Sequence, residues 1–495
     1  MKKTLCTLLV LCGLLLSACG GNATVETAPT ESATDNTPTD TTEIETEPED
    51  RTYLDDLPDG LDYGGYDFRV LVYEGGNLPT GDTGAWLNYF ALEGETGEPI
   101  NDAVYNRNAA VSDRFNVKIE QLDGKSLGME GYARKTVQAG EDAMDVVLGT
   151  SALNTLITDG ILVDLKSVPY IDLEKPWYDQ NSIASLSIAN KVYVTAAEIN
   201  IMDKDATWCV LFNKDMAQDL SLGDYYQMVH DGTWTQDVML TGMEAASIDV
   251  NGNGERDADD QWGNVGENFD TMGYMVASGA RCFTKDENDL PKLSVLDERY
   301  VDSYTKAMAI NGNFDLCMYA SKFGNDWSIL DSVFTEGRCL FSFVGMNRVT
   351  LFREMEADFG ILPAPKYDEA QDSYYNVISC GNATFVSIPK SVQDLERTGI
   401  ITEALCAESL YTLTPAYYDV ALQRKYMSDE ESRDMLAIIL ENRTIDQSVA
   451  YNWGGLFGTL SGLTTTQNAD FASKFAKMEP TMQTAMDKFI ENIEK

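Results

Sequence analysis

The arrangement of apolar runs constrains the fold of this chain most strongly. Residues 68–73, 145–148 and 208–212 are short runs rich in β-branched and aromatic residues. Strands that are covered by helices on both faces have this composition. Helical patterns lie between and after them, as at 101–115 and 297–311. Strands that alternate with helices predict an α/β body with largely parallel sheets.

The pattern occurs twice along the chain, which favours two lobes. The chain has 495 residues, and roughly 430 remain without its first segments, more than one hydrophobic core usually holds. After about residue 205 the pattern begins again, and a short strand at 359–362 stops at Pro363. Two further helices are predicted at 428–442, with a capping box formed by Ser428 and Glu431, and at 471–493.

The first residues have the features of an export signal. Lys2 and Lys3 precede an apolar run at 8–16, which is too short to cross a bilayer comfortably. The sequence Leu-Ser-Ala-Cys that ends at Cys19 resembles a bacterial lipobox, in which the cysteine is acylated and becomes the first mature residue. Residues 1–18 are therefore predicted to be a lipoprotein signal peptide. The alternative is an ordinary secretory signal with an incidental cysteine.

Composition predicts a tether and excludes some partners. Residues 19–62 are rich in Thr, Glu, Asp and Pro, with few large apolar side chains, which predicts an acidic disordered tether. The formal net charge of −44 argues against nucleic acid and against direct binding to anionic membranes. No second apolar stretch is long enough for a transmembrane helix, so the acyl chains are expected to be the only membrane anchor.

The cysteines and the single histidine limit the chemistry. Six cysteines lie in the body, widely spaced and mostly among apolar neighbours, which favours buried free thiols and leaves one disulfide open: Cys209, Cys282, Cys317, Cys339, Cys380 and Cys406. His230 is the only histidine, so zinc sites and Ser-His-Asp or Cys-His catalysis are disfavoured. Acidic residues are abundant, and a catalytic carboxylate pair therefore stays open.

Residues 249–260 fit the pattern of a twelve-residue calcium loop. Oxygen-bearing residues occupy positions 1, 3, 5 and 9, a glycine stands at position 6, and position 12 is acidic. The predicted ligands are Asp249, Asn251, Asn253, Glu255 through its carbonyl, Asp257 and Asp260. Asp260 replaces the usual glutamate, so we expect a weaker, structural calcium site. The alternative is a polar Asn-Gly turn without metal.

Trp453 is the tryptophan most indicative of a sugar site. It lies in the sequence Tyr-Asn-Trp-Gly-Gly, whose polar and glycine-rich character favours an exposed ring beside a cleft. The flat face of such a ring stacks on the C–H face of a sugar.

The order of these features resembles the extracellular solute-binding lipoproteins of ABC importers, in family 1 with maltose-binding protein. The segments that carry the resemblance are 95–108 (ETGEPINDAVYNRN), 176–178 (PWY), 212–214 (FNK), 231–235 (DGTWT) and 334–341 (FTEGRCLF). The calcium loop, followed by Asp-x-Trp-Gly, also stands where such proteins carry one.

The resemblance implies a two-lobe, type II periplasmic-binding-protein-like fold with a hinge and a ligand cleft between the lobes. Lobe 1 would comprise 63–200 and 361–412, and lobe 2 would comprise 201–360 and 413–495. Hinge crossings would lie near 197–207, 358–364 and 411–416. Carried over to this chain, the cleft walls would include Thr150, Ser151, Asn268, Phe269, Gly345, Met346 and Trp453.

The resemblance implies a monomeric, lipid-anchored receptor at the outer face of a bacterial membrane. Such a receptor captures a small solute, here expected to be an oligosaccharide, and delivers it to an ABC permease; it is not an enzyme. Two alternatives remain at this point: a surface adhesin for glycans or peptides, and a glycoside hydrolase with a carboxylate pair.

Overall fold

In the computed structural model, all described helices and strands belong to the unit Thr52–Lys495. The described residues are 51–73, 90–150, 153–324, 328–355, 357–422, 430–468 and 470–494. Cys19, Ser151 and Ser428 lie outside them, as do the signal peptide 1–18 and nearly all of the tether. No helix within these ranges combines the length and the apolar character that a membrane crossing requires.

The first sheet has four strands in the order β12-β3-β1-β2. β1 pairs in parallel with β2 and β3, and β12 returns antiparallel to β3. The strands are β1 (Tyr66–Val72), β2 (Val117–Asp123), β3 (Val146–Gly149) and β12 (Phe385–Ser387). The helices that accompany them are α1 (Pro99–Phe115), α2 (Gly124–Leu127), α3 (Met129–Gln138), α4 (Leu153–Thr158), α5 (Gln180–Leu186), α13 (Leu395–Tyr411) and α14 (Leu413–Leu422), with a 3-10 turn η1 (Leu165–Ser167).

The second sheet has five strands in the order β10-β4-β9-β5-β8, and it is also mixed. Its strands are β4 (Trp208–Asn213), β5 (Trp262–Gly266), β8 (Cys317–Tyr319), β9 (Cys339–Gly345) and β10 (Phe359–Leu362). The helical elements in this part of the chain are α6 (Met202–Asp205), α7 (Lys214–Asp219), α8 (Tyr225–His230), α9 (Gln236–Ala246), α10 (Asp270–Ala277), α11 (Glu298–Asn311), η2 (Ala320–Phe323), α12 (Ser328–Thr335) and η3 (Met346–Glu354).

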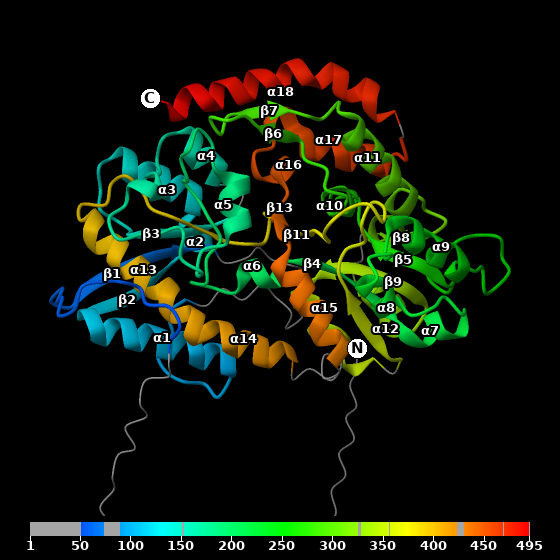
Figure 1. Ribbon diagram of the computed structural model, residues 1–495, viewed down its shortest axis with the longest axis horizontal. Helices are drawn as coiled ribbons and strands as arrows, with labels where there is room; N and C mark the ends of the chain where they lie inside the picture. The colour runs from blue at the N-terminus through cyan, green and yellow to red at the C-terminus, as the bar shows by residue number, and fades with distance from the viewer. Residues whose placement is uncertain are drawn as a thin grey trace, which may run out of the picture. The chain divides into compact units, whose positions relative to one another are not determined.

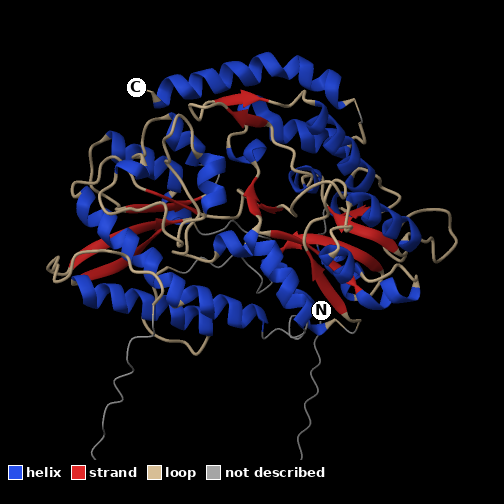
Figure 2. Ribbon diagram, viewed as in Figure 1, coloured by secondary structure: helices blue, strands red, loops and turns tan. Residues whose placement is uncertain are grey.

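Short strands and the C-terminal helices complete the unit. The parallel pair β11 (Asn376–Ile378) and β13 (Arg443–Ile445) lies between the two sheets (Figure 1). The remaining elements are the hairpin β6 (Phe283–Lys285) and β7 (Pro291–Leu293), and the helices α15 (Glu430–Glu441), α16 (Gln447–Ala450), η4 (Trp453–Gly455), α17 (Leu456–Thr465) and α18 (Phe471–Ile493). The long α18 contacts α4 and also α11, so it touches helices from both parts of the unit. Figure 2 shows the strands of the two sheets with helices around them.

The strands and helices predicted from apolar patterning are present. The central residues of β1, β3 and β4 are buried, as the continuous apolar runs predict. The sheets are mixed, and not as parallel as the strand–helix alternation predicts, because β12 and β4 each pair antiparallel with a neighbour. The six body cysteines are all buried and free, which confirms the prediction of free thiols.

The ordered body begins earlier than composition predicts. Residues 52–62 were assigned to the tether, but Leu57 is buried, and Tyr53 exchanges hydrogen bonds with Tyr411 in α13. Asp55 forms an ion pair with Arg114 of α1. These contacts attach the segment to the helices beside the first sheet.

The chain also crosses between the sheets at places that differ from the expected ones. β10, whose residues were divided between the two predicted lobes, lies wholly in the second sheet. Both α13 and α14 pack against α1, so α14, which begins within the crossing predicted at 411–416, still lies beside a helix of the first sheet.

Candidate binding cavity

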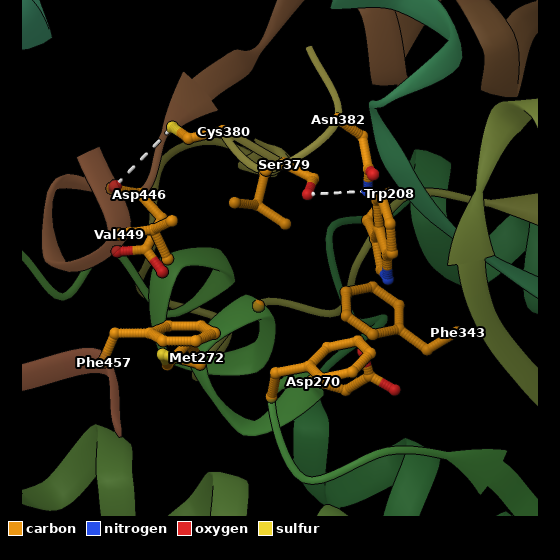
Figure 3. Close-up of a pocket in the computed structure, with 14 residues that line it drawn as sticks. Trp208, Asp270, Met272, Phe343, Ser379, Cys380, Asn382, Asp446, Val449 and Phe457 are labelled. Carbon is orange, nitrogen blue, oxygen red and sulfur yellow. Dashed lines mark hydrogen bonds between the residues drawn. The ribbon is translucent and has the colours of Figure 1, made fainter. Parts of the chain in front are cut away.

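Two adjoining compartments at the edge of the second sheet form one cavity. Their volumes are about 320 Å³ and about 210 Å³, of the size that binds small ligands. The two compartments share six wall residues, which are Trp208, Phe269, Asp270, Phe343, Ser379 and Asn382. In Figure 3, Trp208 and Phe343 stand on one side of the smaller compartment, and Val449 and Phe457 stand on the other.

Glycines in the sheet and in α10 make room for the aromatic wall. Trp208 is the half-buried first residue of β4, and its side chain hydrogen-bonds the Asp270 carboxylate. A Cβ at Gly345 would lie 3.1 Å from the Trp208 ring, and a Cβ at Gly273 would lie 2.5 Å from the Phe343 ring. Larger residues at these glycines would therefore displace the rings that line the cavity.

A segment that connects the two sheets provides another wall. Residues 379–382 follow β11 and precede β12 of the first sheet. The Asn382 Nδ2 donates to Ser379 Oγ at 3.2 Å, and the Ser379 N–H donates to the Ala206 carbonyl at 2.8 Å (Figure 3). Residues 379–382 therefore line the cavity and also form part of the connection between the sheets.

Buried carboxyl groups dominate the charge of the cavity. Glu267, Asp270 and Asp446 are each at most 6% exposed, and burial raises the pKa of all three carboxyls. Arg348 is the only basic side chain among the described residues of the two walls, and its Nη2 donates to both carboxylate oxygens of Asp331. No other wall residue neutralises the remaining acids.

Several residues that were expected in the cleft are near this cavity. Phe269 is half-buried and lines both compartments, and Gly345 lines the larger one. Asn268 precedes Phe269 and donates through Nδ2 to Thr465 Oγ1 at 2.8 Å. Thr150, at the end of β3, is buried and lines a small neighbouring space together with Cys380 of the inter-sheet segment.

Met346 and Trp453 do not line either compartment. Side chains alternate along β9 towards Gly345, and the next residue, Met346, is fully buried in the core. The expectation of an exposed Trp453 ring is wrong, because only 7% of this residue is exposed. The ring stacks on Tyr451 with a centroid distance of 4.8 Å and also contacts Phe283 and Phe489.

Trp208, Asp270, Phe343, Asn382 and Phe457 were not predicted as cavity residues. The apolar run 208–212 predicts a buried strand, whereas its first residue, Trp208, is only half-buried and lines the cavity. Trp208 directly follows the hinge crossing predicted at 197–207, and this position indicates a residue near the cleft. Asn382 and Phe457 come from distant segments, and nothing in their local sequence marks them.

The loop 249–260 has the turn geometry of its predicted motif. Gly254, at position 6, has a positive φ of 80°, and the Asp249, Asn251, Asn253 and Asp257 side chains accept backbone N–H groups of the loop. Asp260 is buried, accepts from the Val250 and Asp257 N–H groups, and lies 3.6 Å from Arg256 Nη1. Within the described ranges, no three His, Cys, Asp or Glu side chains gather closely enough to hold a metal. Any metal here would need the amide and carbonyl oxygens of the loop.

Two mixed sheets, joined by crossing segments beside a cavity, define the fold of the substrate-binding proteins of ABC importers, as the resemblance implied. The chain matches no protein-family model and no curated protein.

Particular solved structures show this likeness over nearly their full length. UspC of M. tuberculosis has a TM-score of 0.55 at 13% identity, covering 84% of this chain and 100% of that chain. An ABC substrate-binding protein of Listeria monocytogenes, solved in complex with cycloalternan, gives 0.50 at 12% identity, with 87% and 98% covered. The apo-form of RafE from Streptococcus pneumoniae gives 0.51 at 13% identity, with 87% and 97% covered. At 12–13% identity, these likenesses show the fold of the chain and nothing finer.

Proposed function

We propose that this chain is a lipid-anchored solute-binding protein that captures an oligosaccharide and delivers it to an ABC permease at the outer face of a bacterial membrane. The observation that carries the proposal is the cavity beside the inter-sheet segment, whose walls contain the aromatic rings of Trp208, Phe269, Phe343 and Phe457. Flat rings and buried polar groups together suit a ligand with apolar C–H faces and hydroxyl edges. The function is binding, without catalysis.

The ligands of proteins with the same fold support this choice. The Listeria protein is in complex with cycloalternan, and a cyclo/maltodextrin-binding protein with a TM-score of 0.51 is complexed with maltotetraose. The sequence features of an acylated Cys19 support the anchor, and the fold supports the permease as partner.

Calorimetry with a panel of oligosaccharides tests the proposal. We expect reversible, saturable binding by the full chain, and no new reducing ends after long incubation with the bound sugar. Hydrolysis of the sugar would indicate a glycosidase. Absence of binding to every saccharide in the panel would contradict the proposal.

We also propose that the loop 249–260 binds a structural calcium ion. Its donors are hard oxygens, which calcium prefers, and the left-handed turn at Gly254 suits the position-6 glycine of such loops. The existing contacts of Asp260 with two N–H groups and Arg256 predict weak affinity. A bound ion that prefers the folded state stabilises it, so EGTA should lower the melting temperature of calcium-saturated protein and added calcium should restore it. An unchanged melting temperature would remove the calcium proposal.

A further inference from the structure

The cavity walls carry more acidic than basic side chains. Four acidic residues line the two compartments, namely Glu267, Asp270, Asp331 and Asp446, against the single basic residue Arg348 among the described lining residues. Because the Arg348 guanidinium already binds both oxygens of Asp331, those two charges cancel. Glu267, Asp270 and Asp446 are then left without a basic partner among the described lining residues.

The nearest further cation does not fill the cavity. Arg281 interacts electrostatically with Asp446, but it lines a neighbouring pocket. Its guanidinium donates to the Val276 and Ala280 carbonyls and to Thr444. Arg281 therefore faces Asp446 from outside the two compartments. It is not among the groups that influence the pKa of Glu267 or Asp270.

The protein partners of the three carboxyls are incomplete. Glu267 is 5% exposed, and its Oε1 has no hydrogen-bond partner. Asp270 accepts from the Glu267 N–H at 2.7 Å and from Trp208, and Asp446 accepts from Ser448. These contacts are all with uncharged donors. Burial raises the pKa of these carboxyls because ionising them without a counter-charge is costly, and a cation in the cavity would offset that cost.

The aromatic wall also suits a cation. Trp208, Phe269 and Phe343 lie around Asp270 in the larger compartment. The negative face of an aromatic ring attracts an ammonium group, and more strongly where water is excluded. Aromatic faces beside unpaired carboxyls thus match a ligand with both sugar-like faces and a positive charge.

We propose that the oligosaccharide recognised by this cavity carries a free, protonated amine, so that the solute class is an amino-sugar oligomer. This inference rests on the proposed function. A neutral sugar would donate hydroxyl hydrogens but would supply no cation to Glu267 and Asp270, whereas Asp446 already has Arg281 outside the cavity. An acidic sugar would add like charge. A quaternary ammonium would supply charge but no N–H donor for the Glu267 carboxyl.

The experiment compares matched ligands on the purified full chain by calorimetry at near-neutral pH. The probes are a glucosamine trimer, its fully N-acetylated counterpart, a maltotriose, a galacturonic acid trimer and choline. The glucosamine trimer should bind about tenfold more tightly than the N-acetylated trimer, as expected for one desolvated charge pair.

Isosteric variants locate the preference in the cavity. Glu267→Gln and Asp270→Asn keep the size of each side chain and remove its charge, so each should reduce the preference for the amine. Glu479→Gln, on the exposed side of α18, removes one charge that does not line the cavity and should leave the preference unchanged. A loss of preference in Glu479→Gln would overturn the inference, because it would assign the effect to the net charge of the whole molecule.

The outcomes separate the inference from the proposed function. If the N-acetylated trimer or maltotriose binds as tightly as the glucosamine trimer, the amine inference is wrong and the solute-binding function stands. Tightest binding of galacturonic acid or choline would also overturn it. If no saccharide binds, the proposed function itself fails.

Discussion

At the scale of single residues, Phe269 is the side chain whose removal should affect binding most directly. It is half-buried and faces both compartments, so truncation removes contact area without opening the core. Phe269→Ala should weaken ligand binding by about tenfold or more, as for central aromatic anchors. Calorimetry with the best ligand of the panel measures this.

Phe314 provides the matched control. It is also a half-buried phenylalanine, but it packs on Tyr319 at a centroid distance of 4.9 Å and does not line the cavity. Phe314→Ala should leave affinity unchanged. Equal losses in both variants would show that the effect is on stability and not on binding.

Glu403 should make stability depend on pH. It is fully buried in α13 and accepts hydrogen bonds from Trp177 Nε1 and the Tyr178 hydroxyl. Burial raises its pKa from 4.5 to about 8. The folded chain therefore holds this proton more tightly than the unfolded chain, and the fold loses stability as pH rises from 4.5 towards 8.

Glu403→Gln removes this titration. The melting temperature of the variant should fall less than that of the native chain over the same pH range, whereas Glu479→Gln should follow the native curve. Parallel curves for Glu403→Gln and the native chain would contradict the assignment, since other buried carboxyls contribute equally to both.

Local sequence predicted some cavity residues and misplaced others for a definite reason. Phe269 and Gly345 follow or end strands, and strand ends meet at one edge of a sheet. Trp453 has a polar, glycine-rich neighbourhood, but the burial of its ring is decided by Tyr451, Phe283 and Phe489. Those contacts come from three-dimensional packing, which spacing does not show.

At the scale of elements, a buried ion network joins segments that accompany different parts of the fold. Arg443 of β13 donates to Asp203 of α6 at 2.5 Å and to Asp179, the N-cap of α5, at 2.9 Å. Arg443→Met would remove the cation paired with Asp179 and leave Asp203 with Lys204 alone, whose Nζ lies 3.6 Å away. We expect a loss of about 3–5 kcal/mol in the free energy of unfolding, measured by urea denaturation.

Arg134 is the control for this loss. It pairs with Asp159 at 2.6 Å, with about a third of each side chain exposed. Arg134→Met should cost about 1 kcal/mol or less. A similarly small cost for Arg443→Met would mean that the network contributes little to holding these elements.

Two glycines in helices should respond oppositely to the same substitution. In α13, a Cβ at Gly399 would lie 2.0 Å from the Pro169 carbonyl oxygen, whereas at Gly131 in α3 nothing lies within 4 Å. Gly399→Ala should destabilise the protein by about 2 kcal/mol or more through forced displacement. Gly131→Ala should stabilise it by about 0.5–1 kcal/mol through helix propensity. Thermal denaturation checks both, and equal signs would contradict the packing of α13 on this carbonyl.

The bounds of individual helices and strands were easier to predict from the sequence than the partners with which the strands pair. The long amphipathic pattern at 471–493 predicted α18 with its observed bounds. The antiparallel return of β12 and the inclusion of β10 in the second sheet depend on contacts between residues far apart in sequence. Periodicity within one segment carries no information about its partner.

At the scale of the whole molecule, the proposed anchor determines where the protein is found. Cys19→Ala removes the thiol that the acyl chains would modify. The variant should leave the membrane fraction and enter the medium or the periplasm, because the acyl chains are the proposed attachment. Fractionation with an antibody against the body measures this, and a Cys209→Ala variant, altered at a buried thiol, should stay in the membrane fraction. Retention of Cys19→Ala would contradict the anchor.

The two-sheet architecture could be anticipated, because repeated strand–helix patterns and the ordered motifs both point to it. The cavity could be anticipated only in part. Its aromatic and acidic walls come from Trp208, the 267–273 region, β9 and the 379–382 segment, which are brought together only in the fold.

The position of residues 379–382 gives the molecule a mechanical property. Asn382 forms part of the cavity wall, and only two residues separate it from β12, which is hydrogen-bonded into the other sheet. A displacement of Asn382 would therefore reach the first sheet through only two intervening residues. We therefore expect contacts made at Asn382 to be coupled to the first sheet through this short stretch of backbone.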